Sequence, residues 1–141
     1  KIVNFISNLC HEITNKHHIS YLSEDSIIQK YLVNKKTLFF QDPTFPDIIV
    51  YCGLSLLHLS ILDFTNINNY YLKFQEIPKI IILHNNIYIT SHSLNKCREI
   101  ESVLKANLLI LDSNSKKNIL SSEEICNLKN WDAEKYRQNL N

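Results

Sequence analysis

Histidine gives this chain its widest range of possible chemistry, because an imidazole can ligate a metal ion or exchange a proton near neutral pH. Two of the six histidines are the better site candidates: His84 closes an apolar run, and His92 stands just before a predicted helix. Side chains at strand ends and helix N-termini line clefts in α/β folds. A structural role is the alternative for both. The adjacent His17 and His18 are predicted to be exposed, and His58 to be a core residue.

Two polar side chains belong to a stretch that is otherwise apolar. Asp47 precedes the β-branched run Ile48–Cys52, which we expect to be an interior strand, and Tyr51 lies within that run. Asp47 and Tyr51 are therefore candidates for substrate binding. A strand-edge carboxylate and a satisfied core hydroxyl are the alternatives. The chain has no P-loop, dinucleotide-binding, serine-hydrolase or zinc-protease motif, and no clustered carboxylate pair of the glycosidase type.

The four cysteines contain no CxxC pair and stand far apart in the sequence. This spacing favours small buried hydrophobic residues in a reducing cytoplasm over a zinc site or a disulfide framework. The cysteines are Cys10, Cys52, Cys97 and Cys126.

Composition limits the remaining classes. The 141 residues, 45% hydrophobic and 21% charged, are typical of one globular domain. The 15 basic residues balance 14 acidic ones without clustering, which argues against a nucleic-acid-binding protein. No apolar run approaches 18 residues, so we expect no membrane span. Because the chain begins at Lys1 without a signal-like segment, we expect an excerpt of a longer cytoplasmic polypeptide.

The elements that must position these residues are organised around one central unit. The apolar run Lys79–Leu83 predicts a buried strand, the pair Asn85-Asn86 a tight turn, and Ile87–Thr90 a returning strand. A helix over Leu94–Leu111 follows, because apolar residues recur there at three- and four-residue steps. This apolar stripe consists of Cys97, Ile100, Leu104, Leu108 and Leu111.

Further helices flank the central unit. Apolar spacing predicts a helix over residues 2–15, a second from a Ser23 cap to about Val33, and a weaker one over 67–74. Ser93 is the expected cap of the long helix. Ser121 and Glu124 form a capping-box pattern, and another helix is expected over 131–137. Together these elements predict a single layered α/β domain with a mixed sheet over residues 1–141.

Three segments resemble the C-terminal half of the class II aldolase/adducin family, in the branch that includes the aldolase part of bifunctional rhamnulose-phosphate aldolase/dehydrogenases. Phe45–Gly53 resembles a "PDxVVYCG" strand, Pro78–Cys97 a buried strand, turn and helix start, and Asn130–Arg137 a "NWExExYR" tail. The tail is the most specific of the three segments. The resemblance spans about Leu38 to Leu140, or roughly two-thirds of the chain.

This resemblance implies a three-layer α/β/α domain with a central mixed sheet, of which residues 1–141 would be an incomplete, C-terminal portion. It also implies a homo-oligomer with sites between subunits and a sugar phosphate as substrate. Active members hold a divalent metal, usually zinc, with an HxH pair and a further histidine in an "NHG" turn. The metal polarises a carbonyl and stabilises the enediolate formed when a C–C bond is cleaved.

Most of the metal ligands of the family have no counterpart in this chain. No HxH occurs, so a metal in the full-length parent would take those ligands from an upstream half, and no metal is expected for this segment alone. The "NHG" turn matches His84-Asn85-Asn86, where Asn85, or Asn86 after a one-residue shift, occupies the histidine position. Asparagine is a poor zinc ligand. His84 beside that position is the one metal-ligand candidate, and Asn85 and Asn86 are substrate-binding candidates.

Three hypotheses for function follow. The first is a class II aldolase-like lyase that cleaves a sugar phosphate in the full-length parent. The second is a noncatalytic, adducin-like scaffold or subunit. The third is an unrelated α/β binding domain, which would be favoured if Ile48–Cys52 and Lys79–Leu83 did not share one sheet.

Overall fold

The computed structural model describes residues 1–53 and 55–113 of the chain. Their elements are α1 (Ile2–Thr14), β1 (Ile19–Leu22), α2 (Ser26–Asn34), a 3-10 helix η1 (Lys36–Phe40), α3 (Asp47–Cys52), β2 (Leu57–Leu59), α4 (Phe64–Phe74), β3 (Ile80–Leu83), β4 (Asn86–Ser91) and α5 (Leu94–Ser113). The predicted capping box at Ser121 and the helix expected over 131–137 lie outside the described residues.

The four strands form one mixed sheet in the order β1-β4-β3-β2. β2 runs parallel to β3, whereas β4 is antiparallel to both β3 and β1. The hairpin was correctly predicted, but its turn lies one residue earlier than expected. His84 and Asn85 form it, with His84 at a left-handed φ of 56°, while Asn86 already pairs with Leu83 in the sheet.

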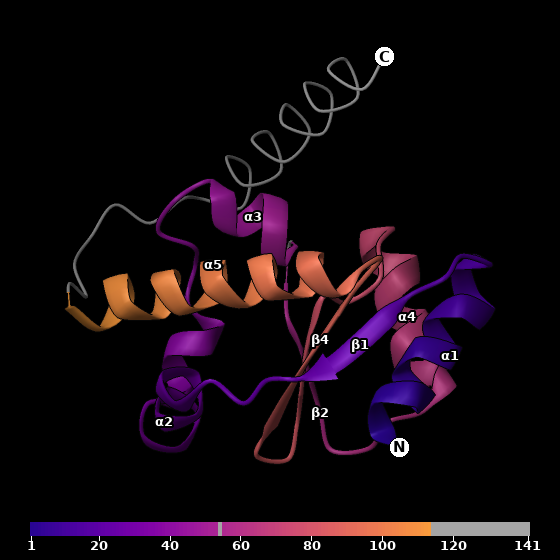
Figure 1. The fold of residues 1–141 in the computed structure, drawn as a ribbon, viewed down its shortest axis with the longest axis horizontal. Coiled ribbons are helices and arrows are strands. Elements are labelled where there is room, and N and C mark those ends of the chain that lie inside the picture. The colour runs from indigo at the N-terminus through magenta and orange to yellow at the C-terminus, as the bar shows by residue number, and fades with distance from the viewer. Residues whose placement is uncertain (54, 114–141) are drawn as a thin grey trace.

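Alternating side chains of the central strands supply two cores, one on each face of the sheet. Ile80, Ile82 and Ile87 pack with α2, α3 and α5, whereas Ile81 and Leu83 pack with α1 and α4. Figure 1 shows α5 crossing the sheet, with α3 beyond it and α1 beside α4. The fold is thus a mixed α/β domain with helices on both faces.

The long helix α5 confirms the apolar stripe. All five predicted residues are at most 4% exposed, and Ser93 Oγ accepts the amide of Lys96 at 3.2 Å as the expected cap. By contrast, Ser23 does not cap α2. Asp25 caps it, accepting the amides of Ile27 at 2.9 Å and Ile28 at 3.0 Å.

The predicted strand over Ile48–Cys52 is wrong, because this segment forms helix α3 and packs against α5. The prediction that it shares a sheet with Lys79–Leu83 is therefore also wrong. Pro46 and Asp47 favour a helix start, and Gly53, at a φ of 84°, ends it. Packing of one face of α3 against α5 outweighs the β-propensity of this run, and the buried residues accordingly repeat with helical spacing. They are Ile48, Ile49 and Cys52.

Among the described residues, no helix has the length and apolarity needed to cross a membrane.

Candidate functional site

A cavity of about 590 Å³ lies where α1, α3, α4 and the start of α5 converge on one end of the central strands. We call it the histidine–lysine pocket after the basic and acidic side chains of its lining: Lys16, His18, Glu76, Lys79, His92 and Lys96. Tyrosine, aliphatic and hydroxyl side chains and the amide of Gln75 complete the wall. A second cavity of about 320 Å³ is lined mainly by apolar side chains, with Asp42 as its one charged residue. The first cavity is therefore the better candidate for recognising a polar ligand.

His18 lies in the wall of the histidine–lysine pocket, only 6% exposed, so the prediction of a surface histidine is wrong. Its Nδ1 lies 2.9 Å from the carbonyl oxygen of Lys16. A carbonyl can only accept, so Nδ1 carries a proton, and in the neutral ring Nε2 is then the unprotonated nitrogen. Burial lowers the pKa of His18 below 6.5, and the neighbouring His92, His17 and His11 lower it further against the Lys16 hydrogen bond. The surroundings of His18 thus favour its neutral form.

His92 stands beside His18 at the mouth of the pocket. The two ring centroids are 5.0 Å apart, and the ring planes are tilted by 33°. His92 is exposed and directly follows β4, whose last residue, Ser91, also lines the pocket. We expected His92 to line a cleft because it precedes a helix, and it does line this pocket.

The pocket carries an excess of positive charge, with three lysines against one glutamate. Lys96 Nζ lies 5.2 Å from the centroid of the Tyr51 ring and 3.2 Å from Glu99 Oε2. Lys79 Nζ donates to the Val50 carbonyl at 3.2 Å, which ties the lysine to α3. The cations thus come from the loop after α1, the segment before β3 and the first turn of α5.

Of the six candidate residues predicted from the sequence, Tyr51 and His92 line this pocket. Asp47 is exposed in the first turn of α3. His84, Asn85 and Asn86 are exposed at the tip of the β3–β4 hairpin, where Gln29 Nε2 donates to the Asn85 carbonyl at 2.6 Å. In Figure 1 this hairpin turn lies at the opposite end of the view from α3. The structure therefore brings Tyr51 and His92 to one pocket and leaves the other four candidates outside it.

The described residues do not form a complete metal site by themselves. Within residues 1–53 and 55–113, no group of three or more His, Cys, Asp or Glu side chains is placed to hold a metal ion. The other residue of the turn that holds His84 is Asn85, and asparagine is a poor zinc ligand.

The cysteines of the described residues are small buried core residues, as predicted. Cys10, Cys52 and Cys97 are all free thiols with at most 5% exposure. Burial raises the pKa of Cys52 to about 12, although the nearby Lys79 charge acts in the opposite direction. Such thiols are protonated at neutral pH and are poor nucleophiles. His58, predicted to be a core residue, is instead exposed on β2, with its ring 5.5 Å from that of Phe40.

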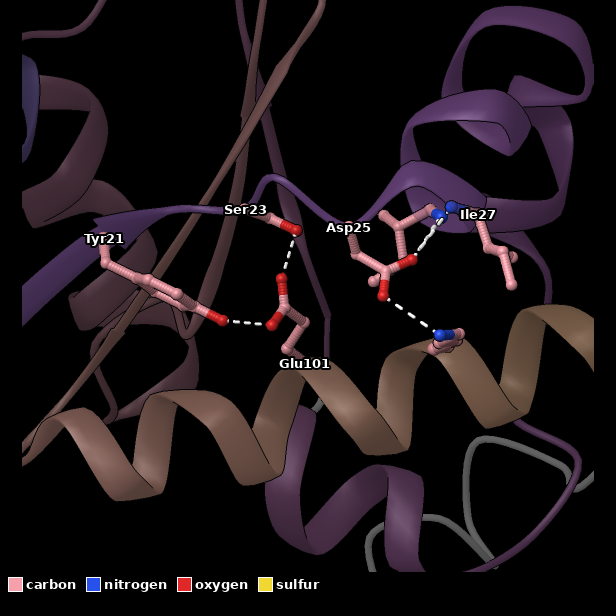
Figure 2. A network of polar contacts seen from close by, with 7 residues as sticks. Tyr21, Ser23, Asp25, Ile27 and Glu101 are labelled. Atoms are coloured by element: carbon pink, nitrogen blue, oxygen red, sulfur yellow. Dashed lines mark hydrogen bonds and ion pairs between the residues drawn. The ribbon is translucent and has the colours of Figure 1, made fainter.

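A second polar cluster joins α5 to the chain between β1 and α2, and we call it the Glu101 network (Figure 2). The hydroxyls of Tyr21 and Ser23 each donate to one carboxylate oxygen of Glu101. One turn later, Lys105 Nζ pairs with Asp25 Oδ2 at 3.0 Å, while Asp25 Oδ1 caps α2. Burial, with the Glu101 carboxylate, raises the pKa of Tyr21. None of these residues lines either cavity, so the network serves the fold.

Comparisons of the chain with protein-family models, with curated proteins and with solved structures found no match.

Proposed function

We propose that this chain is a binding domain for a small anionic organic molecule, of the sugar-phosphate class, which occupies the histidine–lysine pocket. The observation that carries the proposal is the convergence of three lysines on one cavity that contains a single carboxylate. Cations at a partly enclosed site attract an anion more strongly than the same charges in open water.

The dimensions and lining of the pocket support a ligand larger than a bare inorganic anion. Its volume of about 590 Å³ is within the range of roughly 300–1,000 Å³ that is typical of small-molecule sites. Tyr51 and Tyr71 offer aromatic faces, and Ile77 and Ile100 offer aliphatic surface, to an uncharged organic body. The lysines would hold the phosphate. A phosphorylated sugar combines these two parts.

The helix at Asp47–Cys52 favours the binding-domain hypothesis, because this segment does not share a sheet with Lys79–Leu83. This helix stands where the resemblance to class II aldolases implied a strand. The three-layer aldolase-like fold, metal-dependent aldol cleavage in a longer parent protein, the adducin-like scaffold, homo-oligomerisation and a cytoplasmic location stay predictions.

The proposal is tested by titrating the protein with ribose 5-phosphate and, as a matched neutral control, with ribose, using calorimetry at low salt. We expect ribose 5-phosphate to bind and ribose not to. Lys96→Gln should weaken binding about ten- to a hundredfold, because a charge-assisted hydrogen bond contributes about 1.5–3 kcal/mol.

Lys73→Gln is the matched lysine variant. Lys73 Nζ also lies 5.2 Å from an aromatic centroid, that of Phe74, but Lys73 is exposed on α4 and does not line the pocket. It should leave binding unchanged. Equal binding of ribose and ribose 5-phosphate, or equal effects of the two lysine variants, would contradict an anion site in this pocket.

A further inference from the structure

We infer that the histidine–lysine pocket takes up one proton on the His18–His92 pair when it binds its anion, so that acidification strengthens binding. This inference rests on the proposed function and adds its regulation by pH. It is carried by the placement of two imidazoles, 5.0 Å apart, in the wall of a cavity whose other charges are mainly cationic.

The first step is that the surroundings of His18 resist protonation without a ligand. His11 from α1, His17 from the loop after it and His92 from the segment after β4 are the imidazoles whose charge acts on His18. Lys79 and Lys96 line the same cavity. Glu76 is the single acid in the lining, and the remaining titratable groups there are the hydroxyls of Tyr51 and Tyr71. Each cation raises the free energy of an added positive charge.

The second step is that a bound anion reverses this balance. A negative charge within about 4–6 Å of an imidazole favours its protonated form. Because His18 Nδ1 already donates to the Lys16 carbonyl, the proton taken from solvent adds to Nε2. That nitrogen changes from an acceptor into a donor for the anion, and no covalent bond is broken. The His92 ring, whose centroid is 5.0 Å from that of His18, lines the same cavity and is the second member of the pair.

The third step is thermodynamic linkage. If anion binding promotes proton binding, proton binding must promote anion binding by the same factor. Uptake of one proton raises the affinity for the anion by at most about tenfold for each unit by which the pH falls. This holds over the range in which the pair is neutral without the anion and charged with it. Contacts of the lysines with the anion add affinity that does not come from this proton.

The test uses inorganic sulfate as the probe, because its charge stays constant between pH 5.5 and 8, unlike that of a phosphate monoester. Calorimetric titrations of the full chain at several pH values, in buffers of different ionisation enthalpy, give the affinity and the number of protons taken up. We expect affinity to rise several-fold from pH 7.5 to 5.5, with up to about one proton taken up per sulfate.

His18→Asn and His92→Asn should each reduce the proton uptake and flatten the pH dependence. His92 is exposed, so its variant keeps the inference testable if the buried His18→Asn does not fold. His58→Asn is the control, because His58 is exposed on β2 outside the pocket, and it should bind sulfate like the parent.

The outcomes separate the two proposals. Sulfate binding without proton uptake, or uptake unchanged in both pocket variants, would overturn this inference and leave the anion site standing. Failure of sulfate to bind at any pH would overturn this inference. If ribose 5-phosphate also failed to bind, the proposed anion site would be overturned as well.

Discussion

The histidine–lysine pocket and the Glu101 network both adjoin α5, yet they balance charge in opposite ways. In the network, the carboxylates of Glu101 and Asp25 accept hydrogen bonds from two hydroxyls and two helix amides, and Asp25 also pairs with Lys105. The pocket gathers three lysines, two histidines and one carboxylate around an open volume, and Lys96 also pairs with Glu99 outside the lining. A polar cluster whose members bond one another serves stability, whereas a mainly basic lining around a cavity is suited to an external partner of opposite charge.

Leu104→Ala should have the largest effect and should weaken both clusters together. Leu104 is 4% exposed in the core between α5 and the sheet. Its truncation should lower the free energy of unfolding by about 2–5 kcal/mol through lost burial and a residual cavity. Urea denaturation measures this change, with Ser102→Ala, exposed on the same helix, as the control. Unchanged stability would contradict the assigned core face.

Glu101→Ala should separate the two clusters. Without Glu101, the hydroxyls of Tyr21 and Ser23 lose their acceptor, and the free energy of unfolding should fall by about 1–3 kcal/mol. Binding of ribose 5-phosphate measured well below the melting temperature should not change. Glu12→Ala, exposed on α1, controls for the loss of a surface carboxylate. A loss of binding in the folded variant would show that the network and the pocket are coupled.

Asp25→Ala should have a smaller effect, about 1 kcal/mol, because it removes the cap of α2 and the partner of Lys105. Burial opposes ionisation of Asp25, but the Ile28 amide and Lys105 outweigh it and lower its pKa below the ordinary 3.8. Its stabilisation is therefore present above pH 3.8 and lost as the pH falls through the lowered value.

Thermal unfolding between pH 2 and 5 measures this contribution. The gap in melting temperature between the parent chain and Asp25→Ala should close towards the acid end, and Glu24→Ala, at the exposed neighbouring position, should show no such convergence. A gap that stays constant with pH would mean that the Asp25 charge contributes nothing.

Elements whose residue pattern lies within one segment of the chain were predicted correctly. The five-residue stripe of α5 and the hairpin of β3 and β4 follow from periodicity and turn composition. Prediction from the sequence failed at α3, where β-branched residues predict a strand but packing against α5 selects a helix. It also misplaced the cap of α2, because Ser23 and Asp25 both suit a cap and only the position of Glu101 assigns Ser23 elsewhere.

By itself, then, the sequence determined a mixed α/β domain with α5 and the hairpin at its core, since burial of a periodic apolar face depends on spacing within one segment. It also identified Tyr51 and His92 as residues of interest. Only the tertiary structure placed His92 beside His18, which is 74 residues earlier in the chain, and Tyr51 beside Lys96, which is 45 residues later. No local pattern encodes such convergence, because the charge balance of a pocket is a property of its assembled walls.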